Sequence, residues 1–374
     1  MAVKEYTNEE KQDEIISMVD PHTHNDENSV FLGSKTVREE NIRATDTPQV
    51  VGDVLYQSAD TERTTSNTTY TKVKEIAVYR PGDYRIKFDL KTSDGSLYGN
   101  GKVYKNGTPI GTERTAGVYT TFSEDISGWS AGDLIQLYYK SSLQSETDSP
   151  EAGNGGGNTT VDGSMRHYTG ADLAWATIRG GAGTDAFPVV DGGSYCDIWS
   201  GATANWLQIT RGILTFDTSG LPDDATIASA SLSVYFYDRV DDFTQTIYLC
   251  DATPASNNAL VAGDYAQVGT TKYSAGNTFA SITLGQFTSI SLNATGLAAI
   301  SKTGITKIGS RSSSDIDNSE PGFVANKKSY LAGYYADQGS PYVPYLTINY
   351  TVPTSTKNFR LYVAAFDGAT VNTD

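Results

Sequence analysis

The chain has 374 residues and a formal net charge of −16, and 38% of its residues are hydrophobic. This acidic balance argues against nucleic acid as a partner, because phosphate binding needs clustered Lys and Arg. No apolar run approaches the roughly 20 residues of a membrane-spanning helix, so no membrane association is expected. Because the length exceeds one ordinary hydrophobic core, two domains with additional tails are expected.

Residues 1–50 differ from the rest of the chain. One short helix is predicted at 7–20, and the charged sequence that follows lacks periodicity. Such a segment buries too little apolar surface to offset its own ordering entropy. We therefore expect an N-terminal arm that becomes ordered on a partner. The first residues also lack the apolar core of a secretory signal, so export by that route is not expected.

Residues 51–147 are predicted to form a first β-sandwich. In 84–90, apolar Tyr, Ile, Phe and Leu alternate with charged Arg, Lys and Asp, as in a strand that covers a core on one side. Asn106-Gly107 suits the positive φ angles of a tight hairpin, and a turn at 131–133 precedes another strand. Strands joined by tight turns without helices between them indicate an antiparallel sandwich or jelly roll.

The Gly-rich stretch 148–164 is interpreted as a flexible linker. Residues 165–353 are predicted to form a second β-sandwich, with one short helix at 295–304 that Thr295 caps and Gly304 ends. Residues 354–374 are predicted to form a C-terminal strand or a docking tail. Strands of the second sandwich are expected at 213–216, 232–236, 245–250, 287–292, 306–311 and 345–350. The predicted fold class is all-β, with two antiparallel β-sandwich or jelly-roll domains in tandem behind an extended N-terminal arm.

The sequence lacks a recognisable catalytic motif. No nucleophile elbow, zinc-protease, phosphate-binding-loop or dinucleotide-binding pattern occurs, and two of the three histidines lie in the predicted arm. Carboxylate pairs such as Asp223-Asp224 occur, but Asp is common in turns because it hydrogen-bonds its own backbone there. We therefore expect a protein that is not an enzyme and needs no cofactor, with Cys196 and Cys250 as two buried thiols.

Two short patterns are candidate metal sites. His22 and His24 would lie on one side of an extended segment, and three copies around a threefold axis would supply six nitrogens. Asp315 and Asp317 stand at alternate positions, as oxygen ligands of Ca²⁺ can, but the loop lacks the glycine and the distal glutamate of an EF-hand. Solvated histidines and a solvated acidic turn are the simpler interpretations, so no firm metal site is predicted.

Aromatic residues are the candidate interaction residues. Tyr334, Tyr335 and Tyr342 lie in GYYADQGSPYVPYL (333–346), which is predicted to be a loop with exposed rings. Trp199 is a second candidate, since an aromatic ring on a β-sandwich can stack on a sugar ring. The tyrosine-rich loop is therefore a candidate contact surface for a glycan or for another subunit.

The stretch RGILTFDTSGLPDDATIASASLSVYFYD (211–238) resembles a run typical of DNRLRE-type β-sandwich domains. Arg311 and Asp315, followed by the strand YLTINY (345–350), resemble the closing part of the same fold. This resemblance covers about half of the chain. It implies a carbohydrate-binding-module-like sandwich, of a kind found on secreted bacterial proteins and in tailed-phage virion proteins. The matching residues of the long run are Arg211, Phe216, Asp217, Ser219, Leu221, Pro222, Ala225, Ile227, Ala230, Leu232 and Tyr235.

The first β-domain is similar in pattern to jelly rolls of the tumour-necrosis-factor and complement type. The pattern lies in residues 82–88, 103–107 and 131–137. Domains of that family usually trimerise, so this resemblance implies self-association, with a trimer favoured.

The leading hypothesis is a non-enzymatic structural protein of a tailed-phage virion: a head decoration protein, a head fibre or a tail-associated protein. The arm would bind other virion proteins of the capsid or tail, and the sandwiches would present surfaces for assembly or host attachment, with a host glycan as a further partner. The expected localisation is the virion, because lysis releases such a protein without a secretory signal. The alternatives are a carbohydrate-binding-module protein of a bacterial surface system and a polysaccharide depolymerase.

Overall fold

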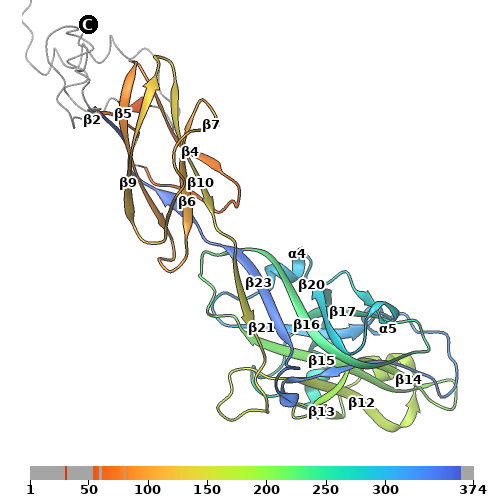
Figure 1. Ribbon diagram of the computed structural model, residues 1–374. Coiled ribbons are helices and arrows are strands. Elements are labelled where there is room, and N and C mark those ends of the chain that lie inside the picture. Colours follow the sequence, from red (N-terminus) through yellow and green to blue (C-terminus); the bar gives the residue numbers. More distant parts are fainter. Residues whose placement is uncertain (1–29, 32–53, 59–60, 80, 364–374) are drawn as a thin grey trace, which may run out of the picture. The chain divides into compact units, whose positions relative to one another are not determined.

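The computed structural model describes residues 30–31, 54–58, 61–79 and 81–363 (Figure 1). Its regular structure is almost entirely antiparallel β-sheet, which confirms the predicted all-β fold class. The described residues divide into two compact units. Unit 1 contains those up to Ser142 and those from Pro353 onward, and unit 2 spans Leu143–Val352. In chain order, unit 2 is therefore inserted between two parts of unit 1.

Unit 1 contains two antiparallel sheets. The strand order of the first is β1-β2-β25-β5-β24-β3, with β9 also paired to β5, and that of the second is β4-β10-β6-β7, with β8 paired to β6. The strands of unit 1 are β1 (Val30–Phe31), β2 (Val54–Ser58), β3 (Arg63–Thr65), β4 (Thr71–Ala77), β5 (Gly82–Thr92), β6 (Gly99–Lys105), β7 (Thr108–Pro109), β8 (Arg114–Ala116), β9 (Thr120–Trp129), β10 (Leu134–Ser141), β24 (Thr354–Thr356) and β25 (Phe359–Val363).

Both sheets of unit 1 contribute to one hydrophobic core. From the first sheet, β5 supplies Ile86, Phe88 and Leu90, and from the second, β10 supplies Ile135 and Leu137, all of them fully buried. The alternation seen in residues 84–90 is thus the alternation of a strand with one face on the core. Two sheets that share one core make unit 1 a β-sandwich, as predicted.

The predicted hairpin at Asn106-Gly107 is confirmed. Asn106 has φ 50° and Gly107 has φ 81°, so both residues adopt the left-handed conformation that a two-residue hairpin turn requires. The Asn106 side chain also joins this turn to the start of β10. Its Nδ2 donates to Asp133 Oδ1 at 2.8 Å, and its Oδ1 accepts from the backbone N–H of Leu134 at 2.7 Å.

The chain returns to unit 1 after unit 2, where the C-terminal strand that was one of the two predictions for 354–374 is present as β25. β25 lies between β2 and β5, and its Phe359 and Leu361 are fully buried. Asp89 on β5 holds the turn before β25, because its Oδ1 accepts from the Thr356 hydroxyl and from the next two backbone N–H groups at 2.7, 2.8 and 2.9 Å. Residues 354–356 and 359–363 are therefore strands inside a sheet of unit 1, and the described part of the C-terminal segment is not a docking tail.

Unit 2 is built on one continuous antiparallel sheet. Its main strand order is β11-β23-β16-β22-β14-β15-β21-β17-β18, and β12, β13, β19 and β20 pair at its sides. The strands are β11 (Gln144–Asp148), β12 (Asp162–Leu173), β13 (Asp185–Phe187), β14 (Gly192–Ser200), β15 (Trp206–Asp217), β16 (Thr226–Asp241), β17 (Thr246–Ala252), β18 (Val268–Lys272), β19 (Asn277–Thr278), β20 (Gln286–Ser291), β21 (Ile305–Ser312), β22 (Lys328–Tyr334) and β23 (Tyr345–Thr351). The short helices are α3 (Trp175–Gly180), η1 (Ala262–Gln267), η2 (Phe279–Ser281), α4 (Ala294–Ala298), α5 (Ser313–Ile316) and η3 (Ala336–Gln338).

A hydrophobic cluster of unit 2 joins three neighbouring strands to two short helices. β12, β14 and β15 contribute Met165, Ile198 and Ile209, while α3 and η1 contribute Ile178 and Tyr265. All five side chains are fully buried. The two helices thus pack on one face of these three strands.

The structure places both the predicted linker, residues 148–164, and the last residues of the predicted first sandwich within unit 2. Residues 144–148 form β11, which pairs with β23 and has no other partner strand among the described residues. The following loop is held by Glu151, whose Oε2 accepts from the backbone N–H of Thr160 at 3.0 Å. The division between the units falls at 142/143 instead of within 148–164. A solvated edge strand made of Gln, Ser, Glu, Thr and Asp lacks the apolar alternation that would have revealed it.

The predicted helix at 295–304 is shorter than expected and begins earlier. α4 ends at Ala298, well before Gly304. Its N-cap is Asn293 instead of Thr295, and the Asn293 side chain accepts from the backbone N–H of Gly296 at 3.0 Å. Within the described ranges, no helix is both long enough and apolar enough to cross a membrane.

Candidate binding surface

Six aromatic rings gather on one face of unit 2. Tyr235 and Tyr237 come from β16, and the others come from β20, β22, β23 and the loop before β23. Neighbouring ring centroids lie 4.7 to 5.6 Å apart, in tilted or edge-on arrangements. Tyr237 is 39% exposed and the other rings are half-buried. We call this group the aromatic patch: Tyr235, Tyr237, Phe287, Tyr334, Tyr342 and Tyr345.

The alternation of β16 places the first two rings. Leu232, Val234 and Phe236 are buried, so Tyr235 and Tyr237 lie on the opposite face of the strand. The antiparallel register sets Tyr235 directly opposite Phe287 on β20. β22 and β23 pair along the other edge of β16 and bring in the remaining rings. Local patterning and strand pairing together build the aromatic patch.

Gly192 on β14 gives two of these rings their space. It pairs with Tyr334 in the sheet. A Cβ atom at this position would lie 2.9 Å from Cε1 of Tyr237 and 3.1 Å from Cδ1 of Tyr334. Any side chain here would displace both rings, so the absence of one lets them lie close to the backbone.

Hydroxyl and amide side chains continue the same face beyond the rings. Ser231 pairs with Ser291 on β20 and with Thr347 on β23, and Thr347 pairs in turn with Thr147 on β11. Every second position along these strands lies on this face, and these positions carry Ser, Thr or Asn. We call this set the hydroxyl rows: Ser145, Thr147, Ser229, Ser231, Ser233, Ser289, Ser291, Thr347 and Asn349.

The aromatic patch and the hydroxyl rows contain no charged residue, but the exposed carboxylate of Asp238 adjoins Tyr237 and accepts from the Tyr330 hydroxyl at 2.7 Å. Arg239, the cation that follows on β16, donates from Nη1 to the carbonyl of Phe279 at 2.8 Å, within the fold. Burial raises the pKa of Tyr237, and Tyr334 and Asp238 raise it further, so its phenol stays protonated at neutral pH. The surface therefore offers ring faces and neutral hydrogen-bonding groups.

Two of the three predicted tyrosines belong to the aromatic patch. Tyr334 and Tyr342 are half-buried, with ring centroids 4.9 Å apart. Tyr335 is instead fully buried. Its ring stacks on Tyr195 at 4.7 Å, and its hydroxyl donates to the carbonyl of Ser194 at 3.2 Å. Consecutive residues of an extended chain point to opposite faces, so only one of the Tyr334-Tyr335 pair can face outward.

The sequence prediction missed Tyr235, Tyr237 and Phe287, while Tyr345 lay within the predicted contact stretch 333–346 but was not named as a candidate. Tyr235 and Tyr237 carried a usable signal, because both stand at outward positions of a clearly alternating strand. Phe287 carried none by itself, since only strand pairing brings it beside Tyr235 and within 5.2 Å of Tyr345.

Trp199 lies on β14 and is not part of the aromatic patch. It pairs with Lys328 on β22, and Lys328 Nζ sits 5.3 Å from the centre of its ring system. The indole N–H is buried and has no hydrogen-bond partner among the described residues. Because a lysine covers one face of the indole, Trp199 is poorly placed to stack on a ligand.

Asp315 is a buried structural residue and not a Ca²⁺ ligand. Its two oxygens accept four hydrogen bonds from the guanidinium groups of Arg211 and Arg311, at 2.7 to 2.8 Å. Asp315 is fully buried, and the two arginines are 3% exposed. Despite burial, these partners lower the pKa of Asp315 to about 2. The four hydrogen bonds leave no oxygen lone pair free for a cation.

Asp317, the other candidate oxygen ligand, is not part of a metal site with Asp315. The Asp317 carboxylate instead pairs with Lys272 at 2.7 Å. Within the part of the chain that the structure describes, no three His, Cys, Asp or Glu side chains are grouped to hold a metal ion. His22 and His24 lie outside the described residues.

Cys196 and Cys250 are unpaired and buried, as predicted. Burial raises the pKa of both thiols well above its usual range, so neither forms a thiolate near neutral pH. They act as small apolar side chains of the core.

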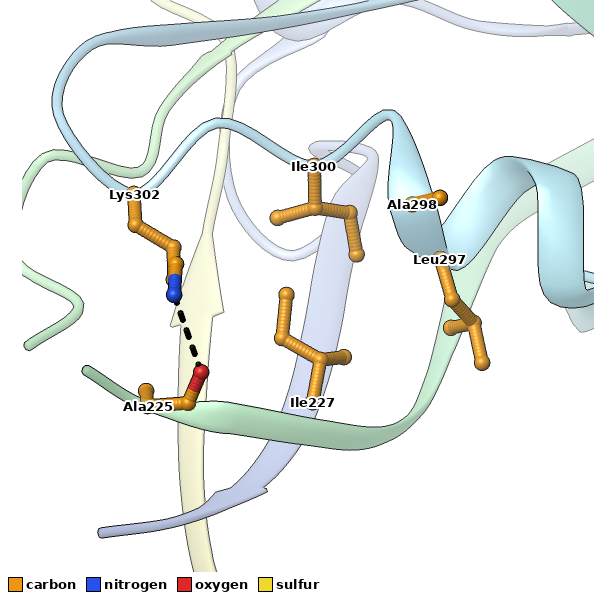
Figure 2. A pocket seen from close by; sticks show the side chains of 6 residues that line it. All are labelled: Ala225, Ile227, Leu297, Ala298, Ile300 and Lys302. Carbon is orange, nitrogen blue, oxygen red and sulfur yellow. Dashed lines mark hydrogen bonds between the residues drawn. The ribbon is translucent and has the colours of Figure 1, made fainter. Parts of the chain in front are cut away.

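One apolar groove lies between α4 and the start of β16. Figure 2 shows Ile227, Leu297 and Ile300 lining it, together with two alanines and Lys302. Lys302 Nζ donates to the carbonyl of Ala225 at 3.1 Å and so closes one side of the groove. Its volume is about 280 Å³. Lys302 is the one titratable group in its lining, so the groove has no acid–base pair for catalysis.

Comparisons with known proteins assign no family. No protein-family model matches the chain, and no curated protein matches it. Similar solved structures include the infectious bursal disease virus Gx strain, at 12% identity over 87% of this chain and 82% of that chain, with a TM-score of 0.15. The Gt strain matches at 11% identity over 91% and 93%, with a TM-score of 0.15. The VP2 subviral particle of the same virus matches at 10% identity over 88% and 87%, with a TM-score of 0.17. These neighbours are virus particle structures, and TM-scores this low assign neither fold nor function to the chain.

Proposed function

We propose that the protein is a non-enzymatic structural protein of a tailed-phage virion, which carries the aromatic patch and the hydroxyl rows as a contact surface. The observation that supports this most is the placement of six half-buried or exposed rings on an open sheet face instead of in a cleft. Exposed aromatic faces of this kind suit association with a partner. The partner in this proposal lies outside the particle.

The perturbed carboxyls of unit 2 support the non-enzymatic part of the proposal. Burial raises the pKa of Asp162 to about 8 and that of Asp197 to about 6, which are values suited to acid–base catalysis. However, Asp162 is 1% exposed and Asp197 is 2% exposed. Asp162 accepts from the N–H of Ala336 at 2.9 Å, and Asp197 accepts from the Gln208 amide at 2.8 Å. Carboxyls enclosed in this way contact no substrate.

The virion part of the proposal is supported by the N-terminal sequence and by the composition of the chain. Residues 1–50 are charged and aperiodic, which suits an arm that binds capsid or tail proteins. The acidic, cysteine-poor, all-β chain is typical of such proteins, and repeated symmetric contacts would give a homo-oligomer, with a trimer favoured. We assign it to the virion as a head decoration, head fibre or tail-associated protein.

The test is to fractionate purified particles from the source of the chain and probe them for the protein. We expect it to co-sediment with particles at a fixed ratio to the major capsid protein. A variant lacking residues 1–29 is expected to stay in the soluble fraction with its melting temperature unchanged, since β1, which pairs with β2, begins at Val30. Absence of the full chain from particles would contradict the proposal. Release of reducing ends from any polysaccharide would contradict its non-enzymatic part.

A further inference from the structure

We propose that the carboxylates of Asp162 and Asp337 in unit 2 form a binding site for a hard divalent cation, with Ca²⁺ as the preferred ion. Asp162 is the first residue of β12, and Asp337 lies in η3, so the two ligands come from segments that are far apart in sequence. This inference goes beyond the proposed function and does not rest on it.

Asp162 has a buried oxygen without a partner. The residue is 1% exposed. Its Oδ2 accepts from the backbone N–H of Ala336 at 2.9 Å, which places the carboxylate against η3. Its Oδ1 is also buried and has no hydrogen-bond partner among the described residues. A buried carboxylate oxygen in this state costs free energy unless a proton, a water molecule or a cation meets it.

Asp337, the residue that follows Ala336, has a second oxygen of this kind. Its Oδ2 is buried and likewise lacks a hydrogen-bond partner within the described ranges. The backbone N–H groups of Gly153 and Val190 donate to the Asp337 carboxylate. Such donors favour the charged form of a carboxylate. Asp337 therefore brings a negative charge to the site, and two other backbone segments hold it in position.

The two carboxylates are close enough to interact, and no basic side chain neutralises them. Burial raises the pKa of Asp162 to about 8, and the charge of Asp337 adds to this rise. Burial also raises the pKa of Asp337, and the nearby Asp191 raises it further. In the described part of unit 2, neither carboxylate pairs with a Lys, Arg or His side chain. A bound cation would supply the missing counter-charge.

The chemistry of the donors favours Ca²⁺. Carboxylate oxygens are hard ligands, which suit Ca²⁺ and Mg²⁺ better than metals that prefer thiolate or imidazole. Mg²⁺ keeps several waters in a regular octahedron, whereas Ca²⁺ accepts backbone carbonyls in an irregular shell. A carbonyl lies beside the site, since a Cβ atom on Gly163, the residue after Asp162, would be 2.4 Å from the oxygen of Phe187. Two carboxylates are a sparse set, so we expect a Kd of about 0.1–1 mM.

A cation at this site would stabilise the stretch that carries part of the aromatic patch. Tyr335 donates its backbone N–H to the carbonyl of Asp191 at 3.0 Å, and Tyr342 donates to the carbonyl of Gly339 at 3.0 Å. Asp337 lies between these two contacts. Because the cation would link Asp337 to β12, its removal should accelerate hydrogen exchange in residues 336–342 and leave exchange in unit 1 unchanged.

The experiment measures melting temperature and Tb³⁺ luminescence on the full chain after treatment with EDTA and dialysis. At constant ionic strength, 10 mM Ca²⁺ should raise the melting temperature by about 3–8 °C, and 10 mM Mg²⁺ by less than about a third of that. Tb³⁺ replaces Ca²⁺ at oxygen sites and luminesces when a neighbouring tyrosine absorbs light. We expect a Tb³⁺ signal that Ca²⁺ displaces, with Tyr335 as the nearby tyrosine.

Two variants remove the ligands one at a time. Asp162→Asn keeps an acceptor for the Ala336 N–H, and Asp337→Asn changes a half-buried residue, so the second variant still tests the site if the first is poorly folded. Each should weaken Ca²⁺ binding at least about tenfold and abolish the displaceable Tb³⁺ signal. The increase in melting temperature with Ca²⁺ should be lost in both.

The matched control is Asp264→Asn. Asp264 is also 1% exposed and lies in unit 2, but both of its oxygens have partners. They accept from the backbone N–H groups of Ala255 and Val261, each at 2.9 Å. This variant should have a lower melting temperature in EDTA and should keep the full increase with Ca²⁺.

Three results would overturn the inference: no effect of Ca²⁺, equal effects of Ca²⁺ and Mg²⁺, or an undiminished Ca²⁺ effect in both ligand variants. Equal effects of the two ions would show screening of the net charge of −16. No Ca²⁺ effect, together with a pH dependence of stability that Asp162→Asn removes, would show that the two carboxyls share a proton instead. Absence of the chain from particles would contradict the proposed function and leave this site assignment standing.

Discussion

Each unit carries tyrosines on an outer sheet face, but their surroundings differ. In unit 1, Tyr104 stacks on Tyr138 at 4.0 Å, and Lys140 Nζ lies 4.7 Å from the ring centre of Tyr70. The Tyr70 hydroxyl donates to Glu113 at 2.7 Å. In unit 2, the rings of the aromatic patch adjoin one another and neutral hydroxyls. Similar residues thus lie among ion pairs in unit 1 and form a cluster of adjoining rings in unit 2.

The units also differ in how they use a buried carboxylate. Asp89 of unit 1 accepts its hydrogen bonds from a hydroxyl, backbone N–H groups and an amide, all neutral. Asp315 of unit 2 accepts from two guanidinium groups. Both residues join segments that are distant in sequence. Each buried carboxylate therefore links separate segments of its unit: Asp89 holds the turn before β25, and Asp315 on α5 links β15 and β21. We expect the free energy of unfolding to depend more on Asp315, because its partners are charged.

The largest effect is expected from Asp315→Ala. The change leaves two buried guanidiniums without a counter-charge and should lower the free energy of unfolding by about 3–5 kcal/mol. Hydrogen exchange should accelerate in β15 and β21, where Arg211 and Arg311 lie, while unit 1 keeps its protection. If Asp315→Ala unfolds at the same denaturant concentration as the unmodified chain, the structural role assigned to this carboxylate is wrong.

A second expected effect concerns pH. The pKa of Asp162 is raised to about 8, so the folded state holds its proton more tightly than the unfolded state does. Its stabilising contribution is complete below about pH 4 and is lost as pH rises to 8, by at most about 1.4 kcal/mol for each pH unit. Asp162→Asn keeps an acceptor for the Ala336 N–H and should flatten the decline in melting temperature between pH 6 and 8.

Asp197 and Asp148 also make the stability depend on pH, so Asp162→Asn should not remove the whole decline in melting temperature. Burial raises the pKa of each to about 6, so both contribute a decline of the same sign at lower pH. Asp315 acts in the opposite direction, because its pKa is lowered to about 2 and its contribution is lost only as pH falls from about 4 towards 2. A decline between pH 6 and 8 that is unchanged in Asp162→Asn would show that another group causes it.

Asp89→Ala tests the buried carboxylate of unit 1, whose hydrogen-bond donors are all uncharged. It removes the acceptor for the turn before β25 and should destabilise unit 1 by about 2 kcal/mol. This loss is smaller than the one expected from Asp315→Ala in unit 2. Limited proteolysis should then cut near residues 356–358 faster than in the unmodified chain. Thr356→Val, which removes a single donor to Asp89, is the graded control and should show an intermediate rate.

The smallest expected effect is that of Lys140→Met in unit 1. It removes the cation above the Tyr70 ring and an exposed ion pair with Glu113, together worth about 0.5 kcal/mol. Chemical denaturation at low and high salt should show the difference shrinking as salt is added. A loss above about 2 kcal/mol would mean that the ion pairs around the tyrosines of unit 1 are more than a weakly stabilising surface network.

Local patterning was sufficient to predict much of the β-structure. Alternation at 84–90 and 232–236 identified strands with one buried face, because side chains on a strand alternate between its two faces. Asn106-Gly107 identified a hairpin because few residue pairs adopt two positive φ angles at low cost. These features depend on residues within one strand or turn, and the chain displays them without reference to its distant parts.

The pairing of distant segments was not visible in the same way. β25 enters the middle of a unit 1 sheet, Asp315 joins two arginines, and Tyr335 turns inward while Tyr334 faces out. Each outcome depends on which strands become neighbours, because a polar strand at a sheet edge, a buried ion pair and a stacked ring are stabilised by partners far away in the chain. The sequence therefore specified strands and turns, while contacts between remote segments specified the order of the sheets, the use of each carboxylate and the face on which the aromatic patch forms.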